Sequence, residues 1–169
     1  MTCRRLLILW HSRTGAARQL ADAAAHGARQ VAHDLADSRL RVQCCNATAV
    51  TLDDWLRADG YLFCAPENLG SLSGAMKECF DQAYYALEGR IEGRPYALAI
   101  AAGTDGEGAR RQVERIVTGW RLQAIAPALI ARNGAQQRDQ ILAPKRLSAE
   151  HADAAAELGG TLAGWLLLG

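Results

Sequence analysis

The sequence predicts an α/β fold in which a doubly wound parallel sheet of five strands carries helices on both faces. Short apolar segments alternate with stretches of helical periodicity, as expected for strands joined by crossover helices. The first segment runs from Leu6 to Trp10 without a polar residue, which is typical of a parallel strand buried on both faces. The predicted strands lie near residues 4–10, 39–44, 60–65, 95–102 and 127–132.

Helices are predicted between these strands. The first follows residue 17 with Leu20, Ala24, Ala28, Val31 and Leu35 on one face. A short helix is expected around residues 53–56, a longer one after Gly74 that Ser73 would cap, and another after Gly108. The last begins near Ser148. It is expected to bury Leu158, Leu162, Trp165 and Leu166, with Gly159 and Gly160 allowing close packing. The polar stretch 133–145 is predicted to be a loop.

Composition favours one domain spanning residues 1–169, with 50% hydrophobic and 22% charged residues. The net charge of +1 and the absence of a Lys or Arg run disfavour a nucleic-acid partner. The apolar runs are too short for a signal peptide or a membrane span. The five cysteines form no Cys-x-x-Cys pair, so we expect a reducing, cytoplasmic location. No metal site is expected, because His26 and His33 lack a third ligand.

The loop after the first strand has the composition of a phosphate site. It reads His11-Ser12-Arg13-Thr14-Gly15-Ala16-Ala17 and leads directly into a helix. It matches neither the Gly-x-x-x-x-Gly-Lys-Ser/Thr loop nor the Gly-x-Gly-x-x-Gly loop, so neither a triphosphate nor a dinucleotide is expected there. Two hydroxyls, a glycine and helix N-terminal amides suit a single terminal phosphate. An ordinary helix N-cap is the alternative for these residues taken alone.

Two further loops follow the third and fourth strands, at residues 65–74 and 103–108. In a doubly wound sheet with strand order 2-1-3-4-5, the carboxyl ends of strands one, three and four meet at one crevice. The three loops are therefore expected to converge there. Taken alone, the glycine-rich turn 103–108 also fits a plain strand-to-helix connection.

Together these motifs resemble the flavodoxin-like superfamily, most closely its NAD(P)H-dependent FMN reductase and quinone reductase branches. The resemblance covers essentially the whole chain. It rests on Ser12-x-Thr14-Gly15, on Ala65-Pro66-Glu67-Asn68-x-Gly70-x-x-Ser73-Gly74-Ala75-x-Lys77 with Phe80-Asp81, and on the Gly103–Gly108 turn. It implies a three-layer flavodoxin-like sheet of order 2-1-3-4-5 and FMN as cofactor.

The resemblance also implies which residues form the site. Those holding the FMN phosphate would be Ser12, Arg13, Thr14, Gly15, Ala16 and Ala17. Those lining the isoalloxazine would be Pro66, Glu67, Asn68, Leu69 and Gly70. Those bordering its pyrimidine end would be Thr104, Asp105 and Gly106. Family members often carry Asn or Gly followed by Thr where this chain has Ala16-Ala17, so one phosphate hydrogen bond is missing, worth roughly 1.5–3 kcal/mol.

The implied reaction passes a hydride from NADPH or NADH through flavin N5 to a small acceptor such as a quinone or free flavin, with no catalytic side chain. A homodimer or homotetramer is implied as well. The loops lack an aromatic residue and the chain is nearly neutral, which disfavours the alternative of an electron carrier serving a protein redox partner. A third possibility is another phosphorylated ligand, or none. Glu67 and Asp105 are the only acids expected near the flavin, and the alternative that they are solvated surface residues is favoured for both.

Overall fold

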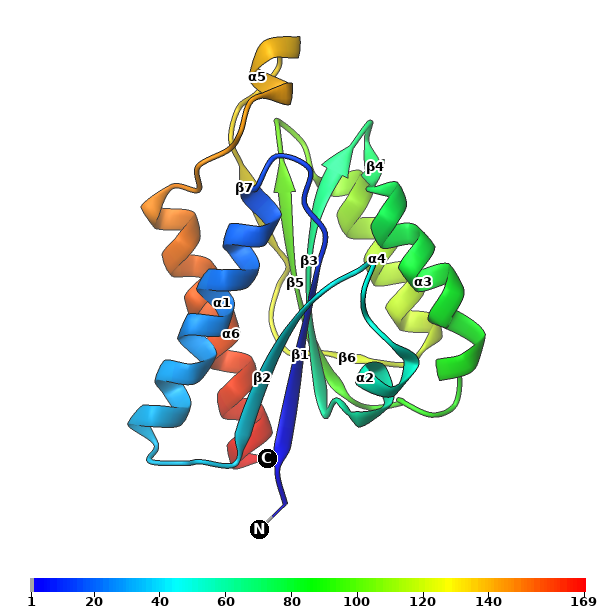
Figure 1. Ribbon diagram of the computed structural model, residues 1–169, viewed down its shortest axis with the longest axis vertical. Coiled ribbons are helices and arrows are strands. Elements are labelled where there is room, and N and C mark those ends of the chain that lie inside the picture. Colours follow the sequence, from blue (N-terminus) through cyan, green and yellow to red (C-terminus); the bar gives the residue numbers. More distant parts are fainter. Residues whose placement is uncertain (1) are drawn as a thin grey trace.

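The computed structural model describes residues 2–169 and confirms the α/β class (Figure 1). The parallel strands lie in the order β2-β1-β3-β5-β6. The strands are β1 (Arg4–Trp10), β2 (Leu40–Asn46), β3 (Gly60–Asn68), β4 (Ser71–Leu72), β5 (Pro95–Ala102), β6 (Gln123–Ala124) and β7 (Leu129–Arg132). The helices are α1 (Ala16–Asp34), α2 (Leu52–Arg57), α3 (Gly74–Leu87), α4 (Glu107–Gly119), α5 (Arg138–Leu142) and α6 (Ala149–Leu168).

The sheet has seven strands rather than the predicted five. The expected fifth strand, near residues 127–132, corresponds to β7, and the additional strand β6 lies just before it; both pair in parallel with β5. Pro127 lies between them, and a proline cannot donate a hydrogen bond to the ladder, which accounts for the break. The other additional strand, β4, pairs antiparallel with the end of β3, where we expected a loop.

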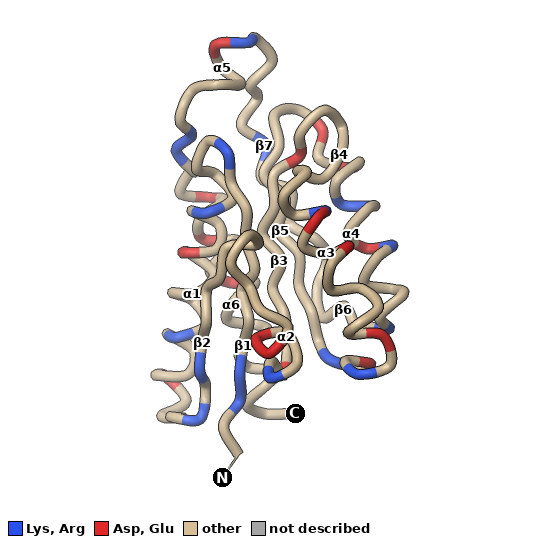
Figure 2. The backbone as a smooth tube through the Cα atoms, turned by 45° about the vertical axis from the view of Figure 1, so that its right-hand side comes forward, with Lys and Arg blue, Asp and Glu red and all other residues tan. Residues whose placement is uncertain are grey.

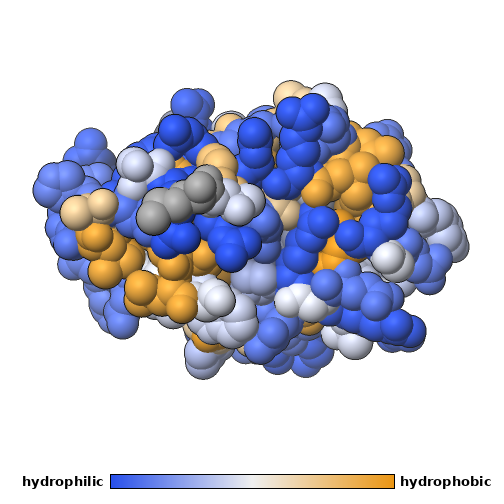
Figure 3. All heavy atoms as spheres, turned by 90° about the horizontal axis from the view of Figure 1, so that it is seen from below, coloured by the Kyte–Doolittle hydropathy of each residue, from blue (hydrophilic) through white to orange (hydrophobic). Residues whose placement is uncertain are grey.

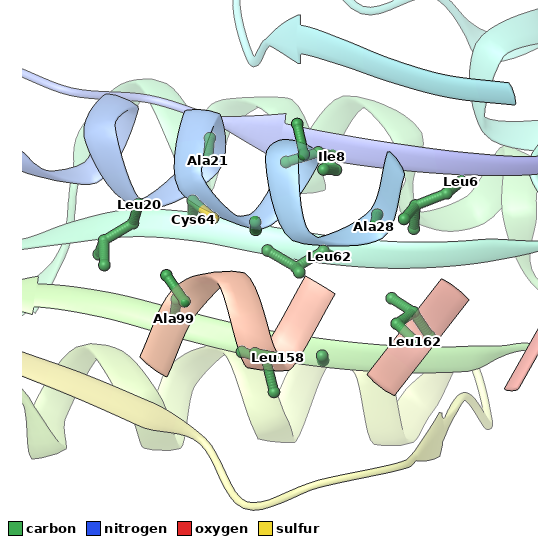
Figure 4. Packing of buried hydrophobic residues seen from close by; sticks show 14 of the residues in the cluster. Leu6, Ile8, Leu20, Ala21, Ala28, Leu62, Cys64, Ala99, Leu158 and Leu162 are labelled. Atoms are coloured by element: carbon green, nitrogen blue, oxygen red, sulfur yellow. The ribbon is translucent and has the colours of Figure 1, made fainter. Parts of the chain in front are cut away.

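Helices α1 and α6 cover one face of the sheet, and α2, α3 and α4 cover the other (Figure 1). Figure 4 shows the first of these interfaces, where Leu6 and Ile8 of β1 and Leu62 of β3 point toward the two helices. A Cβ built on Gly159 would lie 2.0 Å from the Ala24 carbonyl oxygen, so the glycines do permit the predicted close packing.

Two residues expected on the buried helix faces are exposed. Trp165 is 44% exposed, because α6 turns Leu162, Leu166 and Leu167 toward the sheet and leaves Trp165 on its outer side. Leu35 is 43% exposed, because it is the C-cap residue at which α1 ends.

The second interface is rich in aromatic side chains and joins α2, β3, α3 and the end of α4. Trp55 contacts Trp120 with ring centroids 5.3 Å apart, and Phe63 meets Phe80 edge to face at 5.4 Å. Such pairs add about 0.5–1.5 kcal/mol beyond the burial of their area. This cluster gives a rigid base to the loops that leave the carboxyl ends of β3 and β5.

Charge is spread over the molecule rather than gathered into one basic surface (Figure 2). The end of the molecule opposite the carboxyl ends of β1, β3 and β5 is mostly hydrophilic, with separate hydrophobic patches (Figure 3). Within residues 2–169, no helix is both long enough and apolar enough to span a bilayer.

Candidate functional site

The loop between β1 and α1 leaves the N-terminus of α1 uncapped. Gly15 is its N-cap residue with φ of 101°, a left-handed conformation that favours glycine, and no side chain caps the helix. The hydroxyl of Ser12 instead accepts the N–H of Gly15 at 2.9 Å, which closes the loop on itself. The first-turn N–H groups have no partner within a helix, so they can bind an anion.

The segment after β3 is a tight hairpin rather than an irregular loop. β3 extends to Asn68 and turns back into β4 through Leu69 and Gly70. Both turn residues have positive φ, 53° and 71°, as a type I′ hairpin turn requires. Leu69 is fully exposed in this left-handed conformation, which costs of order 1–3 kcal/mol for a residue other than glycine.

Helix α4 holds this hairpin in place from the side. The Gln112 side-chain oxygen accepts the backbone N–H of Leu72 at 2.6 Å and the hydroxyl of Ser71 at 3.0 Å. A Cβ on Gly108 would lie 1.9 Å from the carbonyl oxygen of Gly70, so only glycine allows this approach. The glycine-rich turn therefore has a packing role that the sequence did not reveal.

The loop between β5 and α4 is held by residues from β7 and from the start of the segment 133–148, which connects β7 to α6 and is called the arm below. Gly106 caps α4 with φ of 94°, and a Cβ there would lie 2.4 Å from Ile130. Arg132 donates from Nε to the Asp105 carbonyl at 2.7 Å, and the Gly134 N–H donates to the Gly103 carbonyl at 2.8 Å. The loop conformation is thus set by residues about 30 positions further along the chain.

Glu67 belongs to the β3 strand of the hairpin, and its side chain reaches Gly106 of this loop. Its Oε2 atom is buried and has no hydrogen-bond partner among the described residues. Burial raises the pKa of the Glu67 carboxyl, and the negative charge of nearby Asp105 raises it further. Glu67 thus differs in part from a solvated surface acid, because one carboxyl oxygen is hidden from water although the residue is partly exposed, whereas Asp105 is exposed as expected.

A side-chain bridge joins the first loop to α3. His11 Nδ1 lies 2.9 Å from the hydroxyl of Ser73, which is 1% exposed. Ser73 occupies the N-cap position of α3 as expected, but its hydroxyl makes no capping bond, because it is turned toward His11. Burial, followed by the positive charge of Arg13, lowers the pKa of His11.

The arm between β7 and α6 is attached to the first loop as well. The Lys145 N–H donates to the Thr14 carbonyl at 2.7 Å, and Gln19 donates to the Lys145 carbonyl at 2.7 Å. The Lys145 ammonium donates to three carbonyls of the arm, including that of Gln140 at 2.6 Å. These contacts support the short helix α5 within the stretch 133–145 that was expected to be a loop.

Comparison with known proteins identifies the family. Residues 11–136, more than half of the chain, match the family described as NADPH-dependent FMN reductase. The chain belongs to this family. It is accordingly an oxidoreductase with FMN as cofactor and NAD(P)H as electron donor, as the motifs in the three loops implied.

The relatives of this FMN reductase family member include a flavodoxin and a quinone dehydrogenase. A flavodoxin of Aquifex aeolicus is 26% identical over 169 residues, covering 97% of this chain and 88% of the relative. An NAD(P)H dehydrogenase (quinone) of Acidithiobacillus ferrooxidans is 28% identical over 115 residues, covering 59% of this chain and 58% of the relative.

Solved structures agree on the fold. An oxidoreductase from Corynebacterium diphtheriae has a TM-score of 0.75 at 16% identity, with both chains covered completely. An archaeal flavodoxin has a TM-score of 0.74 at 14% identity, covering 96% of this chain and 98% of the other. These likenesses confirm the flavodoxin-like fold of the reductase.

The carboxyl ends of β1, β3 and β5 in this family member present groups that suit FMN. The uncapped N-terminus of α1 offers N–H groups to a phosphate. Two loops at the carboxyl ends of the neighbouring strands β3 and β5 present backbone groups beside it. A separate hollow of about 540 Å³ between residues 47–55 and α3 has a mainly apolar lining and lies outside these loops.

All fourteen predicted site residues of this reductase lie in the three loops, and those loops are joined by side-chain and backbone contacts. The buried members are Ala16, Ala17 and Gly106, and the exposed members are Arg13, Leu69, Gly70, Thr104 and Asp105. Sequence reasoning missed the supporting residues His11, Gln19, Gln112, Arg132 and Lys145. No local motif marks them, because each acts through a partner 27 or more positions away.

Proposed function

We propose that this reductase, as a single FMN-binding domain, passes a hydride from NAD(P)H through flavin N5 to a small acceptor such as a quinone or free flavin. The observation that carries the proposal is the uncapped N-terminus of α1 behind Gly15, beside two loops that present backbone and no aromatic side chain. Bound FMN supplies the redox chemistry, and the chain supplies binding, orientation and electrostatics.

In this proposal the first loop holds the phosphate. The hydroxyl of Ser12 accepts from Gly15 and still has its own proton to donate, and the Thr14 hydroxyl in the same loop makes no hydrogen bond to residues 2–169. The N–H groups of Ala16 and Ala17 add the helix N-terminus, and Arg13 supplies a positive charge. Backbone donors therefore compensate in part for the hydroxyl that Ala16-Ala17 lacks.

The hairpin and the β5–α4 loop would hold the ring system. Two backbone segments, Pro66 to Gly70 and Thr104 to Gly106, lie at the carboxyl ends of β3 and β5. Hydrogen bonds from other elements fix each of them, through Gln112 of α4 and Arg132 of β7. Such fixed backbone dipoles stabilise charge without having to reorganise. Because neither loop carries an aromatic side chain, the nicotinamide and then the acceptor would have access to the same ring face. The naming of one relative as an NAD(P)H dehydrogenase (quinone) supports a quinone as acceptor.

The proposal also covers the oligomeric state, the location and the partners of the enzyme. Exposed Ile141 and Leu142 on the arm and exposed Tyr85 on α3 support a homodimer or homotetramer. Five free thiols support a reducing, cytoplasmic location, and the mixed surface charge supports the absence of a nucleic-acid partner.

The test is an anaerobic visible spectrum of the purified protein after FMN addition and desalting, followed by NADPH and, separately, NADH. We expect the protein to retain its yellow colour and to bleach promptly with one of the two donors. Colour that persists with both donors would instead indicate an electron carrier. Loss of all colour on desalting would contradict FMN binding.

A Thr14→Ala variant tests the phosphate assignment in the same preparation. Removing one charge-assisted hydrogen bond costs about 1.5–3 kcal/mol, so we expect FMN affinity to fall at least about tenfold in a fluorescence titration. Thr118→Ala is the matched control, because Thr118 lies on α4 and donates only to the Glu114 carbonyl. Equal affinities in the two variants would contradict the assignment.

A further inference from the structure

Glu67 is the residue of the site whose chemistry is unexplained by the binding of FMN alone. Among residues 2–169, its Oε2 is the one buried side-chain oxygen or nitrogen without a hydrogen-bond partner. The atom faces the start of α4, where a Cβ built on Gly106 would lie 3.6 Å away. A carboxylate oxygen hidden from water and left unpaired is costly, so its retention calls for an explanation.

The charges around Glu67 do not remove this cost. Burial raises the pKa of Glu67, and the like charge of Asp105, in the loop before α4, raises it further. The backbone N–H of Gly106 and then the charges of Arg111 on α4 and Arg132 on β7 lower this pKa and only in part offset the effect of burial. Neither arginine reaches Glu67 as an ion pair within the described residues. Arg132 is directed elsewhere, with Nε on the Asp105 carbonyl and Nη2 3.6 Å from Glu107. Glu67 is thus a carboxyl that binds a proton more readily than a solvated one.

The position of Glu67 places this proton site within the candidate cofactor site. Glu67 lies at the end of β3, directly before the turn residues Leu69 and Gly70, and it pairs across the hairpin with Leu72. The hairpin and the β5–α4 loop, between which the carboxyl lies, are the two segments proposed to hold the ring system. A change of charge in that ring system would act on the nearby Glu67 carboxyl, one oxygen of which is hidden from water, where electrostatic interactions are stronger than between fully solvated groups.

We propose that Glu67 takes up one proton from water when the cofactor is reduced, and releases it when the cofactor is reoxidised. This inference rests on the proposed function. The hydride from NAD(P)H carries two electrons and one proton, so its transfer leaves one additional negative charge at the site and an oxidised nicotinamide in solution. The proton taken from water converts the Glu67 carboxylate to a neutral carboxyl and offsets that charge.

Linkage makes the effect reciprocal. If reduction strengthens proton binding at Glu67, then a proton on Glu67 must favour reduction by the same free energy. The redox potential of bound FMN will therefore depend more steeply on pH than the cofactor alone requires, over the range in which Glu67 titrates. Asp105 contributes to this range, because its negative charge strengthens proton binding at Glu67.

The experiment compares wild type, Glu67→Gln and Glu157→Gln, each loaded with FMN. Glutamine keeps the size of the side chain and cannot exchange a proton, and Glu157 is an exposed residue on α6, in the layer across the sheet. The midpoint potential of bound FMN is measured by anaerobic titration at a series of pH values from about 5 to about 9, around the range of perturbed carboxyl groups. The slope against pH counts the protons taken up per electron.

We expect wild type and Glu157→Gln to share a region of steeper slope that is absent from Glu67→Gln. Asp105→Asn should move that region to lower pH, because it removes a like charge. Equal slopes in wild type and Glu67→Gln would overturn the inference, and FMN retention with NAD(P)H bleaching in those samples would show that the proposed function still stands. Failure of wild type to retain FMN would instead overturn the proposed function and this inference with it.

Discussion

At the scale of single residues, the candidate site depends on left-handed backbone conformations and on contacts between distant parts of the chain. Gly15 and Gly106 supply left-handed N-caps, and Leu69 adopts a left-handed conformation despite its side chain. His11 and Ser73 are held together across 62 positions of the chain. Such features persist where the surrounding structure imposes them, and they are common at functional sites.

His11 gives a prediction for stability against pH. Its folded-state pKa is lowered from 6.5, mainly by burial, so the unfolded chain binds a proton more readily. Stability is therefore complete above pH 6.5 and falls as pH drops through 6.5 toward the folded-state pKa. We expect His11→Asn to lose less stability on acidification, by less than about 1.4 kcal/mol per pH unit because solvent screens this half-buried side chain.

Urea unfolding at a series of pH values measures this difference. Asn can still place a polar atom near the Ser73 hydroxyl, so the variant removes the titration while keeping a hydrogen-bond partner. His26→Asn on the exposed side of α1 is the matched control and should follow wild type. A parallel loss in wild type and His11→Asn would show that His11 does not contribute.

At the scale of elements, α1 and α6 approach so closely that glycine is required on both. A Cβ on Gly27 would lie 1.9 Å from the Ala156 carbonyl oxygen, and one on Gly159 would lie 2.0 Å from that of Ala24. Because α1 carries the uncapped N-terminus at its start, this contact also helps to position the first loop.

Gly159→Ala and Gly164→Ala are predicted to have opposite effects on stability. Both glycines lie within α6, where alanine is otherwise favoured by about 0.5–1 kcal/mol. A Cβ on Gly164 meets no atom within 4 Å, so this variant should be stabilised by that amount. Gly159→Ala should be destabilised by about 1–3 kcal/mol through overpacking. Urea denaturation measures the free energy of unfolding of both variants. A stabilised Gly159→Ala would contradict the close packing of α1 and α6.

At the scale of the whole molecule, cofactor binding and folding are linked. A ligand that binds only the native state adds about 2.7 kcal/mol to the free energy of unfolding at one hundred times its Kd. We expect FMN to raise the melting temperature accordingly. Riboflavin, which lacks the phosphate, should raise it much less at the same concentration. Equal shifts with the two ligands, measured by differential scanning calorimetry, would show that the loop after β1 contributes little to binding.

The sequence alone determined the fold class, the order of the five main strands and of the helices α1, α2, α3, α4 and α6, and the three loops that form the candidate site. Apolar runs, helical spacing and glycine positions carry this information locally. The strand pairing at the sheet edge required the structure: β3 continues through Glu67 and Asn68 because β4 pairs with it, and Pro127 lies between β6 and β7. The exposure of Trp165 likewise depended on which side of α6 faces α1 and the sheet.

The tertiary structure also decided the chemistry of individual side chains. Glu67 reads as a surface acid in sequence, and only the hairpin and the β5–α4 loop together bury its oxygen. Ser73 reads as a helix cap, and only its distance to His11 shows where its hydroxyl is used. Periodicity and turn propensity act over a few residues, whereas burial and hydrogen-bond partners arise between segments far apart in the chain. The sequence could therefore locate the candidate site, but it could not show which side chains are buried there or which groups they bond.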